Sequence, residues 1–347
     1  MALTSNPKFS SERHESLVDI CTKLLGAPPD QIEFPGGISR EAYLVHAGGQ
    51  EVIVTRRESV ADAELEAFIL KELSPIGLVP GLKAQHDEWI VQCKLPGTRL
   101  PLALDGCSSV LQQEKLMRIA LDGLLAIHDH GRSKNLAEQV PELGVVPGWL
   151  HSRIKVPLRI SAQLGISPPE FDRQWLHDRL CVDKHEFVKW DARPGNCMLH
   201  EGRAAWFDWE DCGRGFALDD LGFVLFDEWQ PLDDGATQGL IRDYIGAFNS
   251  QLGTMEAEDY LMLFGFVHCL LRLRMAVKFR VRDGHWWPRE KSLWGDKVGV
   301  TPSETHRLIN RTRSVAQKFR NLSDFERWLD QIEALFEISS KSEILAA

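Results

Sequence analysis

The sequence predicts an α+β protein in which a small, strand-rich N-terminal part precedes a larger, mainly helical part. Short β-branched segments separated by turn residues fill the first 93 residues, and long runs with helical spacing follow them. Leu95-Pro96-Gly97 interrupts the pattern between the two parts. We therefore expect two lobes, formed by residues 1–93 and 94–347.

The N-terminal lobe is expected to contain two helices and four strands. Helical spacing of apolar residues predicts helices over Ser11 to Leu25 and Ala61 to Leu73. Strand signals cover four segments: Ile32 to Phe34, Ala42 to His46, Glu51 to Arg56 and Trp89 to Cys93. Gly48-Gly49 supplies the turn between the second and third strands.

Helices dominate the second lobe. An apolar stripe predicts a helix over Leu111 to Asp129, and five prolines predict that residues 131–170 are irregular. The apolar run from Tyr260 to Leu271 is too short to span a bilayer. Further helices are expected over Leu218 to Asp227, Asp234 to Leu252, Ala257 to Arg280, Pro302 to Arg320 and Ser323 to Phe336.

Composition restricts the class of protein. The 44% hydrophobic and 26% charged residues are typical of a globular chain, and a net charge of −10 disfavours nucleic-acid binding. Seven scattered cysteines without a Cys-x-x-Cys pair favour a reducing compartment. The N-terminal residues lack a signal-peptide pattern. We expect a cytoplasmic protein with no nucleic-acid or membrane partner, and the oligomeric state stays open.

The most informative stretch is residues 188–208, which predict a β-hairpin with polar side chains at its open end. Cys197 to Leu199 and Ala204 to Phe207 are the expected strands. Asn196 and Asp208 are equidistant from Gly202, so a symmetric register makes them face each other. Their Cβ atoms would then lie roughly 4.5–5.5 Å apart, within reach of one cation.

Asp191 lies five residues before Asn196, and the three polar residues together suit phosphoryl transfer. That reaction uses an aspartate to orient and deprotonate a hydroxyl, and oxygen ligands to hold Mg²⁺ on the nucleotide phosphates. Turn preference alone would explain any one of these residues. Their combination around one hairpin favours function.

Two segments carry a family resemblance. Lys189 to Asn196 reads Lys-Trp-Asp-Ala-Arg-Pro-Gly-Asn and resembles the His-Gly-Asp-x-His-Pro-Gly-Asn loop of the aminoglycoside phosphotransferase and choline kinase family. Phe207 to Asp211 is similar to that family's Ile-Asp-Trp-Glu-Asp segment, and Asp220-Leu221 resembles its next signature. The resemblance is tight over about residues 187–222 and looser over about residues 33–130.

The resemblance implies a protein-kinase-like fold and a kinase that transfers the γ-phosphate of ATP to a hydroxyl of a small molecule. Asp191 would be the catalytic base, and Asn196 and Asp208 would hold Mg²⁺. Asp220 would brace the catalytic loop. Residues 1–93 would bind the nucleotide, and residues 94–347 would carry catalysis and the acceptor.

Three positions depart from the family pattern. Lys189 and Arg193 stand where the family usually has histidines, and Phe216 replaces a common aspartate. Neither cation removes a group needed for metal binding or proton transfer, and both could favour negative charge near the phosphates.

The nucleotide half of the site is predicted from weaker signals. Gly36 and Gly37 would let backbone N–H groups approach the phosphates, although a plain turn explains them too. Kinase-like folds pair a cation on the third strand with a carboxylate on the next helix. Alternation with Val52 and Val54 selects Arg56 as that cation, with Glu66 as its partner; two solvated charges are the alternative. Cys93 would lie at the backbone edge that meets adenine.

The acceptor region is the least determined. Asp227, Glu228 and Trp229 could hold a cationic amine, or could form a solvated helix end. His285-Trp286-Trp287-Pro288 could form a binding wall or plug the core. Five basic residues between Arg272 and Arg282 suit the solvated face of a helix, with selectivity for an acidic or phosphorylated acceptor as the alternative.

Two rival functions remain on sequence grounds. A degenerate kinase-like module would bind a nucleotide or small molecule without transfer, and Lys189, Arg193 and Arg56 favour it. A metal-assisted hydrolase is disfavoured because no histidine-rich cluster lies near Asp191.

Overall fold

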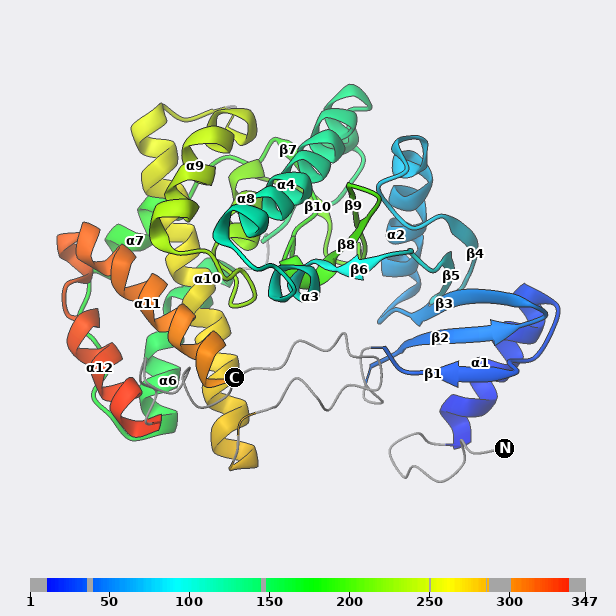
Figure 1. The fold of residues 1–347 in the computed structure, drawn as a ribbon, viewed down its shortest axis with the longest axis horizontal. Coiled ribbons are helices and arrows are strands. Elements are labelled where there is room, and N and C mark those ends of the chain that lie inside the picture. Colours follow the sequence, from blue (N-terminus) through cyan, green and yellow to red (C-terminus); the bar gives the residue numbers. More distant parts are fainter. Residues whose placement is uncertain are drawn as a thin grey trace.

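The computed structural model describes residues 11–35, 40–144, 148–249, 251–284, 286 and 301–336. A five-stranded antiparallel sheet near the N-terminus stands beside a much larger helical part (Figure 1). The predicted α+β class is confirmed.

The N-terminal sheet has the strand order β1-β2-β3-β5-β4. Its strands are β1 (Gln31–Glu33), β2 (Ala42–Ala47), β3 (Gln50–Arg56), β4 (Leu82–His86) and β5 (Trp89–Cys93). One face packs on α1 (Ser11–Leu25) through a cluster that includes Leu17, Val52 and Val54. Strand β4 was not predicted, because it is an edge strand without a fully buried side chain and so lacks a clear apolar alternation.

Helix α2 (Val60–Leu73) lies between the sheet and the helical part (Figure 1). The Ser59 side chain accepts a hydrogen bond from the Asp62 N–H and so caps its first turn. The buried face of α2 belongs to the apolar cluster of the helical part, which it shares with Ile90 of β5. The apolar core is therefore continuous past residue 93.

The connection between the two parts passes very close to a hairpin. Strand β6 (Thr98–Arg99) pairs with β8 (Cys197–His200), which pairs with β9 (Arg203–Trp206). Gly97 has φ of 99°, and a Cβ there would overlap the carbonyl oxygen of Leu199. Only glycine fits this position. Helices α3 (Leu100–Asp105) and α4 (Val110–Ser133) follow.

The prediction that residues 131–170 are irregular is wrong. They contain α5 (Trp149–Ile154) and α6 (Val156–Leu164), and α7 (Arg173–Leu180) follows. Pro157 lies in the first turn of α6, where its missing N–H costs no helical hydrogen bond.

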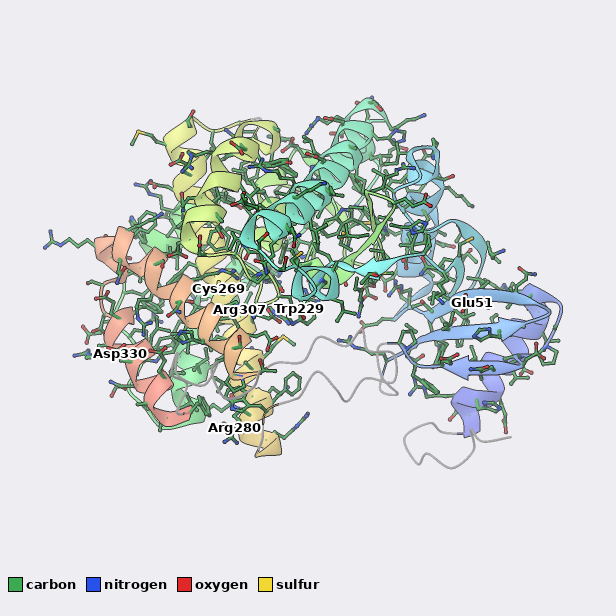
Figure 2. The ribbon with its side chains drawn as sticks, in the orientation of Figure 1. Glu51, Trp229, Cys269, Arg280, Arg307 and Asp330 are labelled. Atoms are coloured by element: carbon green, nitrogen blue, oxygen red, sulfur yellow. The ribbon has the colours of Figure 1, made fainter. Side chains whose placement is uncertain are left out.

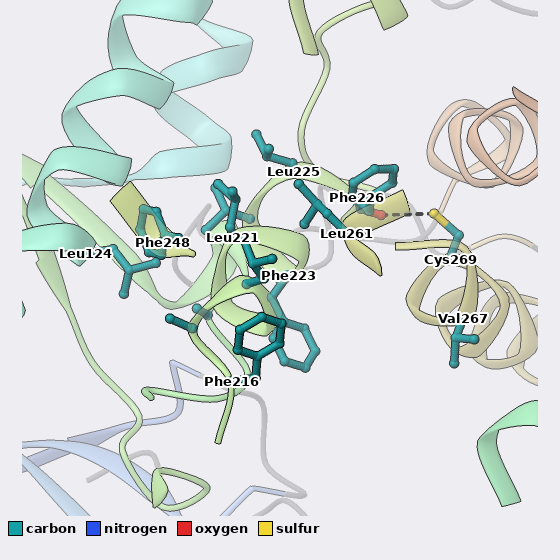
Figure 3. Close-up of a cluster of buried hydrophobic side chains, with 14 of the residues drawn as sticks. Leu124, Phe216, Leu221, Phe223, Leu225, Phe226, Phe248, Leu261, Val267 and Cys269 are labelled. Carbon is teal, nitrogen blue, oxygen red and sulfur yellow. Dashed lines mark hydrogen bonds between the residues drawn. The ribbon is translucent and has the colours of Figure 1, made fainter. Parts of the chain in front are cut away.

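Helix α8 (Ala217–Leu225) lies in the core of the helical part, and all of its residues are buried. Figure 3 shows Leu221 and Phe223 of α8 among Leu124, Phe248 and Leu261, with the Cys269 thiol donating to the Phe226 carbonyl at 3.2 Å. Strands β7 (Glu186–Val188) and β10 (Gly213–Gly215) pair beneath it. Helices α9 (Asp234–Phe248) and α10 (Thr254–Asp283) pack on α8, α11 (Pro302–Lys318) packs on α10, and α12 (Phe325–Phe336) packs on α11.

Helix α10 is longer than the sequence analysis expected. By length and composition, α10 is the one helix among the described residues that could cross a membrane, over Thr254–Arg282. However, 72% of its most apolar window is buried inside the protein. This burial is typical of a core helix.

Candidate active site

The loop that carries Asp191 has an unusual backbone conformation. Trp190 and Asp191 have φ angles of 53° and 48°, a left-handed region that costs a non-glycine residue about 1–3 kcal/mol. Buried Asp220 holds this turn: its carboxylate accepts hydrogen bonds from the backbone N–H of Lys189 at 2.7 Å and of Trp190 at 2.8 Å. His128 Nε2 lies 2.9 Å from the same carboxylate. Asp220 thus braces the loop, as the resemblance implied.

The Asp191 carboxylate has two partners from its own loop. Arg193 donates to both oxygens, at 2.6 and 3.1 Å, and Asn196 Nδ2 donates to Oδ2 at 3.0 Å. Burial alone would raise the pKa of Asp191, but the charge and hydrogen bonds of Arg193 hold it below its usual value. Asp191 is therefore ionised, and its side chain remains 26% exposed.

The predicted register of the hairpin is wrong by one residue. Cys197 pairs with Trp206, and the Phe207 N–H donates to the Asn196 carbonyl at 3.0 Å, so Asn196 lies opposite Phe207 rather than Asp208. A two-residue turn causes the shift, because Glu201 and Gly202 both have positive φ angles, of 48° and 72°.

Lys189 ties the Asp191 loop to the segment that follows the hairpin. Its side chain is completely buried, and its Nζ donates to the Asp208 carbonyl at 2.8 Å. The ammonium also lies 5.2 Å from the Trp209 ring centroid, a cation–π contact. The lysine at the family's histidine position therefore links the two segments that carry the predicted metal ligands.

The predicted Arg56–Glu66 pair is wrong, and the neighbouring arginine takes its place. Alternation does put Arg56 with Val52 and Val54, but that face packs on α1. Arg56 accordingly pairs with Glu88 at 2.7 Å on the surface.

Arg57 forms the pair with Glu66 and joins the two parts of the chain. Its Nε donates to Glu66 at 2.5 Å, Nη1 to Glu210 at 2.5 Å and Nη2 to Asp208 at 3.2 Å. Burial opposes its charge, but these carboxylates raise the pKa of Arg57 above its ordinary value. The same alternation rule, applied to the face opposite Val54, selects this residue.

The acids after the hairpin form one negative region. Burial, followed by the charge of Asp208, raises the pKa of Glu210 to about 7. Burial, and then Asp191 and Asp208, raise the pKa of Asp211. These carboxylates therefore share one electrostatic field with Asp191, which favours a bound cation.

Asn196 and Asp208 suit Mg²⁺ in donor chemistry. Asn196 directs Nδ2 at Asp191, and among the described residues no donor is bonded to its Oδ1. The Asp208 side chain is 36% exposed. The described residues hold no group of three or more His, Cys, Asp or Glu placed as metal ligands, so phosphate oxygens and water would have to complete the shell.

Of the residues predicted to contact the phosphates and adenine, Cys93 is described. Gly36 and Gly37 lie outside the described residues. Cys93 ends β5, and its N–H already donates to the Gly81 carbonyl at 2.8 Å. An adenine would therefore meet its carbonyl or the residues that follow it.

The acids of the predicted acceptor site face inward. Asp227 and Glu228 are both buried. Both oxygens of Glu228 accept from Arg272, and Asp227 lies 3.4 Å from His268. The structure leaves neither carboxylate for a cationic amine. Trp286 contacts Phe336, and its neighbours His285, Trp287 and Pro288 lie outside the described residues.

Trp229 instead packs against the loop that carries Asp191. A Cβ on Gly195 would overlap its ring. Its centroid lies 5.6 Å from the guanidinium of Arg193 and 5.8 Å from that of Arg272. Figure 2 shows Trp229 next to Arg307, which donates to the Glu228 carbonyl at 2.5 Å. Sequence reasoning missed this stack because its members come from distant elements.

Comparisons with known proteins identify the family and the fold. The model of the phosphotransferase enzyme family matches residues 30–257, which is 228 of the 347 residues. No curated protein matches the chain. An amicoumacin kinase in complex with AMP-PNP, Ca²⁺ and Ami superposes with a TM-score of 0.57 at 15% identity, covering 92% of this chain and 98% of that one.

A second solved structure is similar to the chain. A spectinomycin phosphotransferase in complex with ADP and spectinomycin gives a TM-score of 0.53 at 11% identity, covering 87% of this chain and 98% of that one. At these identities the two structures support the fold alone, which is protein-kinase-like. The family match confirms the resemblance seen in the motifs, and the chain belongs to the phosphotransferase enzyme family.

Proposed function

We propose that the protein transfers the γ-phosphate of ATP to a hydroxyl group of a small molecule. The observation that carries the proposal is Asp191, an ionised and partly exposed carboxylate on a strained turn that Asp220 holds in place. Strained backbone is tolerated where the surrounding structure fixes it for a purpose. Asp191 would orient the acceptor hydroxyl and accept its proton.

The remaining residues receive roles in the same proposal. Asn196 Oδ1 and Asp208 would hold Mg²⁺, which neutralises charge on the β- and γ-phosphates when bound. Arg57, positioned by Glu66, would contact the α- and β-phosphates in place of Arg56. Gly36 and Gly37 would cover the phosphates, and Cys93 would border adenine.

The two lobes would keep the roles that the family resemblance implies. Residues 1–93 would bind the nucleotide, and residues 94–347 would supply catalysis and the acceptor site. All seven cysteines are free. A reducing cytoplasm would keep them so.

Asp191→Asn tests the catalytic role. We expect turnover to be abolished and ATP affinity to be nearly unchanged, because the isosteric amide cannot accept the proton. ADP formation with Mg-ATP and a panel of hydroxylated compounds gives turnover, and calorimetry gives affinity. Asp233→Asn, at the start of α9, is a matched control far along the chain. Turnover retained by Asp191→Asn would place the base elsewhere.

Asp208→Ala tests the metal role separately. The variant is expected to weaken Mg-ATP binding, because one of two proposed protein ligands is lost. A calorimetric titration with an unchanged dissociation constant would remove Asp208 from the metal shell.

The Asp191–Arg193 ion pair favours one second candidate, a kinase-like module that binds its ligand without transfer. Arg193 engages both oxygens of the proposed base. ADP formation above background with any acceptor would exclude this candidate.

A further inference from the structure

Arg153 of α5 is a guanidinium close to the proposed base and without a carboxylate partner. Within the described ranges no salt bridge or hydrogen bond joins its side chain to another residue. Its charge is instead stacked on aromatic rings, 4.2 Å from the Trp149 centroid and 6.0 Å from the Trp190 centroid. Trp190 directly precedes Asp191, so the cation lies beside the catalytic loop.

Arg153 also lines a cavity whose walls are otherwise largely apolar. The cavity has a volume of about 40 Å³, and Trp149, Trp190 and Phe223 are among its walls. One water needs roughly 10–15 Å³ of such space, so the cavity admits a few heavy atoms rather than a ring. A carboxylate or phosphate group is of suitable size.

The other polar groups that line the cavity leave the positive charge of Arg153 largely uncompensated. Burial raises the pKa of Asp219 to about 7, against a 2.6 Å hydrogen bond from Tyr260, so this acid is only partly ionised at neutral pH. Burial lowers the pKa of His268, which favours its neutral form. Lys184 donates to the Leu143 carbonyl and adds a second cation.

Two acids that could have favoured a cationic acceptor are already paired inside the protein. Asp227 and Glu228, which could have attracted an amine, are buried against His268 and Arg272. Burial lowers the pKa of Arg153, while Asp219, Asp191 and Asp211 act in the opposite sense, which places this guanidinium within the field of the proposed base.

We propose that the phosphoryl acceptor carries an anionic group, either a carboxylate or a phosphate ester, which Arg153 binds in this cavity while the hydroxyl of the acceptor reaches Asp191. This inference rests on the proposed transfer function. A planar guanidinium held by aromatic rings suits such oxyanions, because it offers two parallel N–H donors to both.

The test uses four compounds that share a chain and a terminal hydroxyl. They are 4-hydroxybutyrate, 4-hydroxybutyl phosphate, 1,4-butanediol and 4-amino-1-butanol. Calorimetry in the presence of Mg²⁺ and AMP-PNP measures binding without transfer. We expect one or both anions to bind at least roughly tenfold more tightly than the diol and the amine, as a charge-assisted contact predicts. The two anions separate a carboxylate acceptor from a phosphorylated one.

Arg153→Gln is expected to abolish this preference, and Arg153→Lys to retain part of it. Arg159→Gln is the matched control, since Arg159 is an exposed arginine on neighbouring α6 that contacts Ser152. Thermal unfolding checks that each variant is folded. The assignment is wrong if neither anion is preferred by the wild type. It is also wrong if Arg153→Gln weakens AMP-PNP binding and keeps the preference, because Arg153 would then serve the nucleotide.

ADP formation separates this inference from the function on which it rests. Equal ADP formation with all four compounds, unchanged in Arg153→Gln, would refute the anion site and leave the transferase intact. Anion binding that Arg153→Gln abolishes, with no ADP formed from any compound, would support the anion site and favour the module that binds without transfer.

Discussion

Replacing Arg57 by methionine should destabilise the protein by about 3–5 kcal/mol, because it leaves a buried carboxylate without its cation. The Glu66 side chain is 0% exposed and lies 2.5 Å from Arg57. The other two partners, Asp208 and Glu210, are 36% and 38% exposed. Water screens these two contacts, so each contributes at most about 1 kcal/mol. The loss therefore comes mainly from Glu66.

Guanidinium unfolding followed by tryptophan fluorescence measures this loss. We would compare the wild type, Arg57→Met, Glu66→Gln and the double variant. The double variant should lose less free energy than the sum of the single variants, because a neutral glutamine needs no counter-charge. Methionine keeps the length and apolar stem of arginine, so little packing is lost.

Arg56→Met provides the control, since it removes the adjacent arginine from the surface. Arg56 is 41% exposed and its partner Glu88 is 27% exposed, so the expected loss is below about 1 kcal/mol. Equal losses in Arg56→Met and Arg57→Met, or strict additivity in the double variant, would refute the reasoning.

Three further outcomes are expected. Gly195→Ala should lower the unfolding free energy by about 1–3 kcal/mol and lower kcat, because the added Cβ overlaps the Trp229 ring. Gly246→Ala is the control: its Cβ would meet open space, so this variant should keep wild-type turnover in the same assay. Asp220→Asn should cost about 1–3 kcal/mol in denaturant unfolding, since an amide donor then faces backbone donors, and wild-type stability would contradict its bracing role. Glu210 has a pKa raised from 4.5 to about 7, so the folded protein binds the extra proton and the stability contribution of Glu210 falls as pH rises through that window. The difference in unfolding free energy between the wild type and Glu210→Gln should change across this window, and a constant difference would disprove the assignment.

Local sequence signals recovered most elements but not the details that need tertiary contacts. The bounds of α1 and β5 were predicted as they stand, because strong periodicity and nearby turn residues mark them. Helices α5 and α6 were missed because a count of prolines ignores their position within a helix, and Pro157 lies in the first turn of α6 rather than breaking it.

The candidate site shows the same division. Asp191 and Asn196 come together as their motif suggested, since one short loop carries both. Asp220 reaches the same loop from α8, 30 residues from Trp190 in sequence, as the family resemblance implied. Choosing between Arg56 and Arg57 required knowing which sheet face α1 covers, and alternation alone cannot supply that. Asp227 was placed at a surface because its partner His268 is 41 residues away in sequence.

The distribution of apolar packing indicates where the protein would open at least cost around the proposed nucleotide site. The sheet and α1 share one hydrophobic cluster, whereas α2 belongs to the other, to which β5 contributes Ile90. Rotation of the sheet as a unit against α2 and the helical part would expose less apolar area than separating α2 from its helices, and so would cost less. Arg57 crosses this boundary to Glu66, Glu210 and Asp208, so any such rotation would have to turn about these ion pairs or break them.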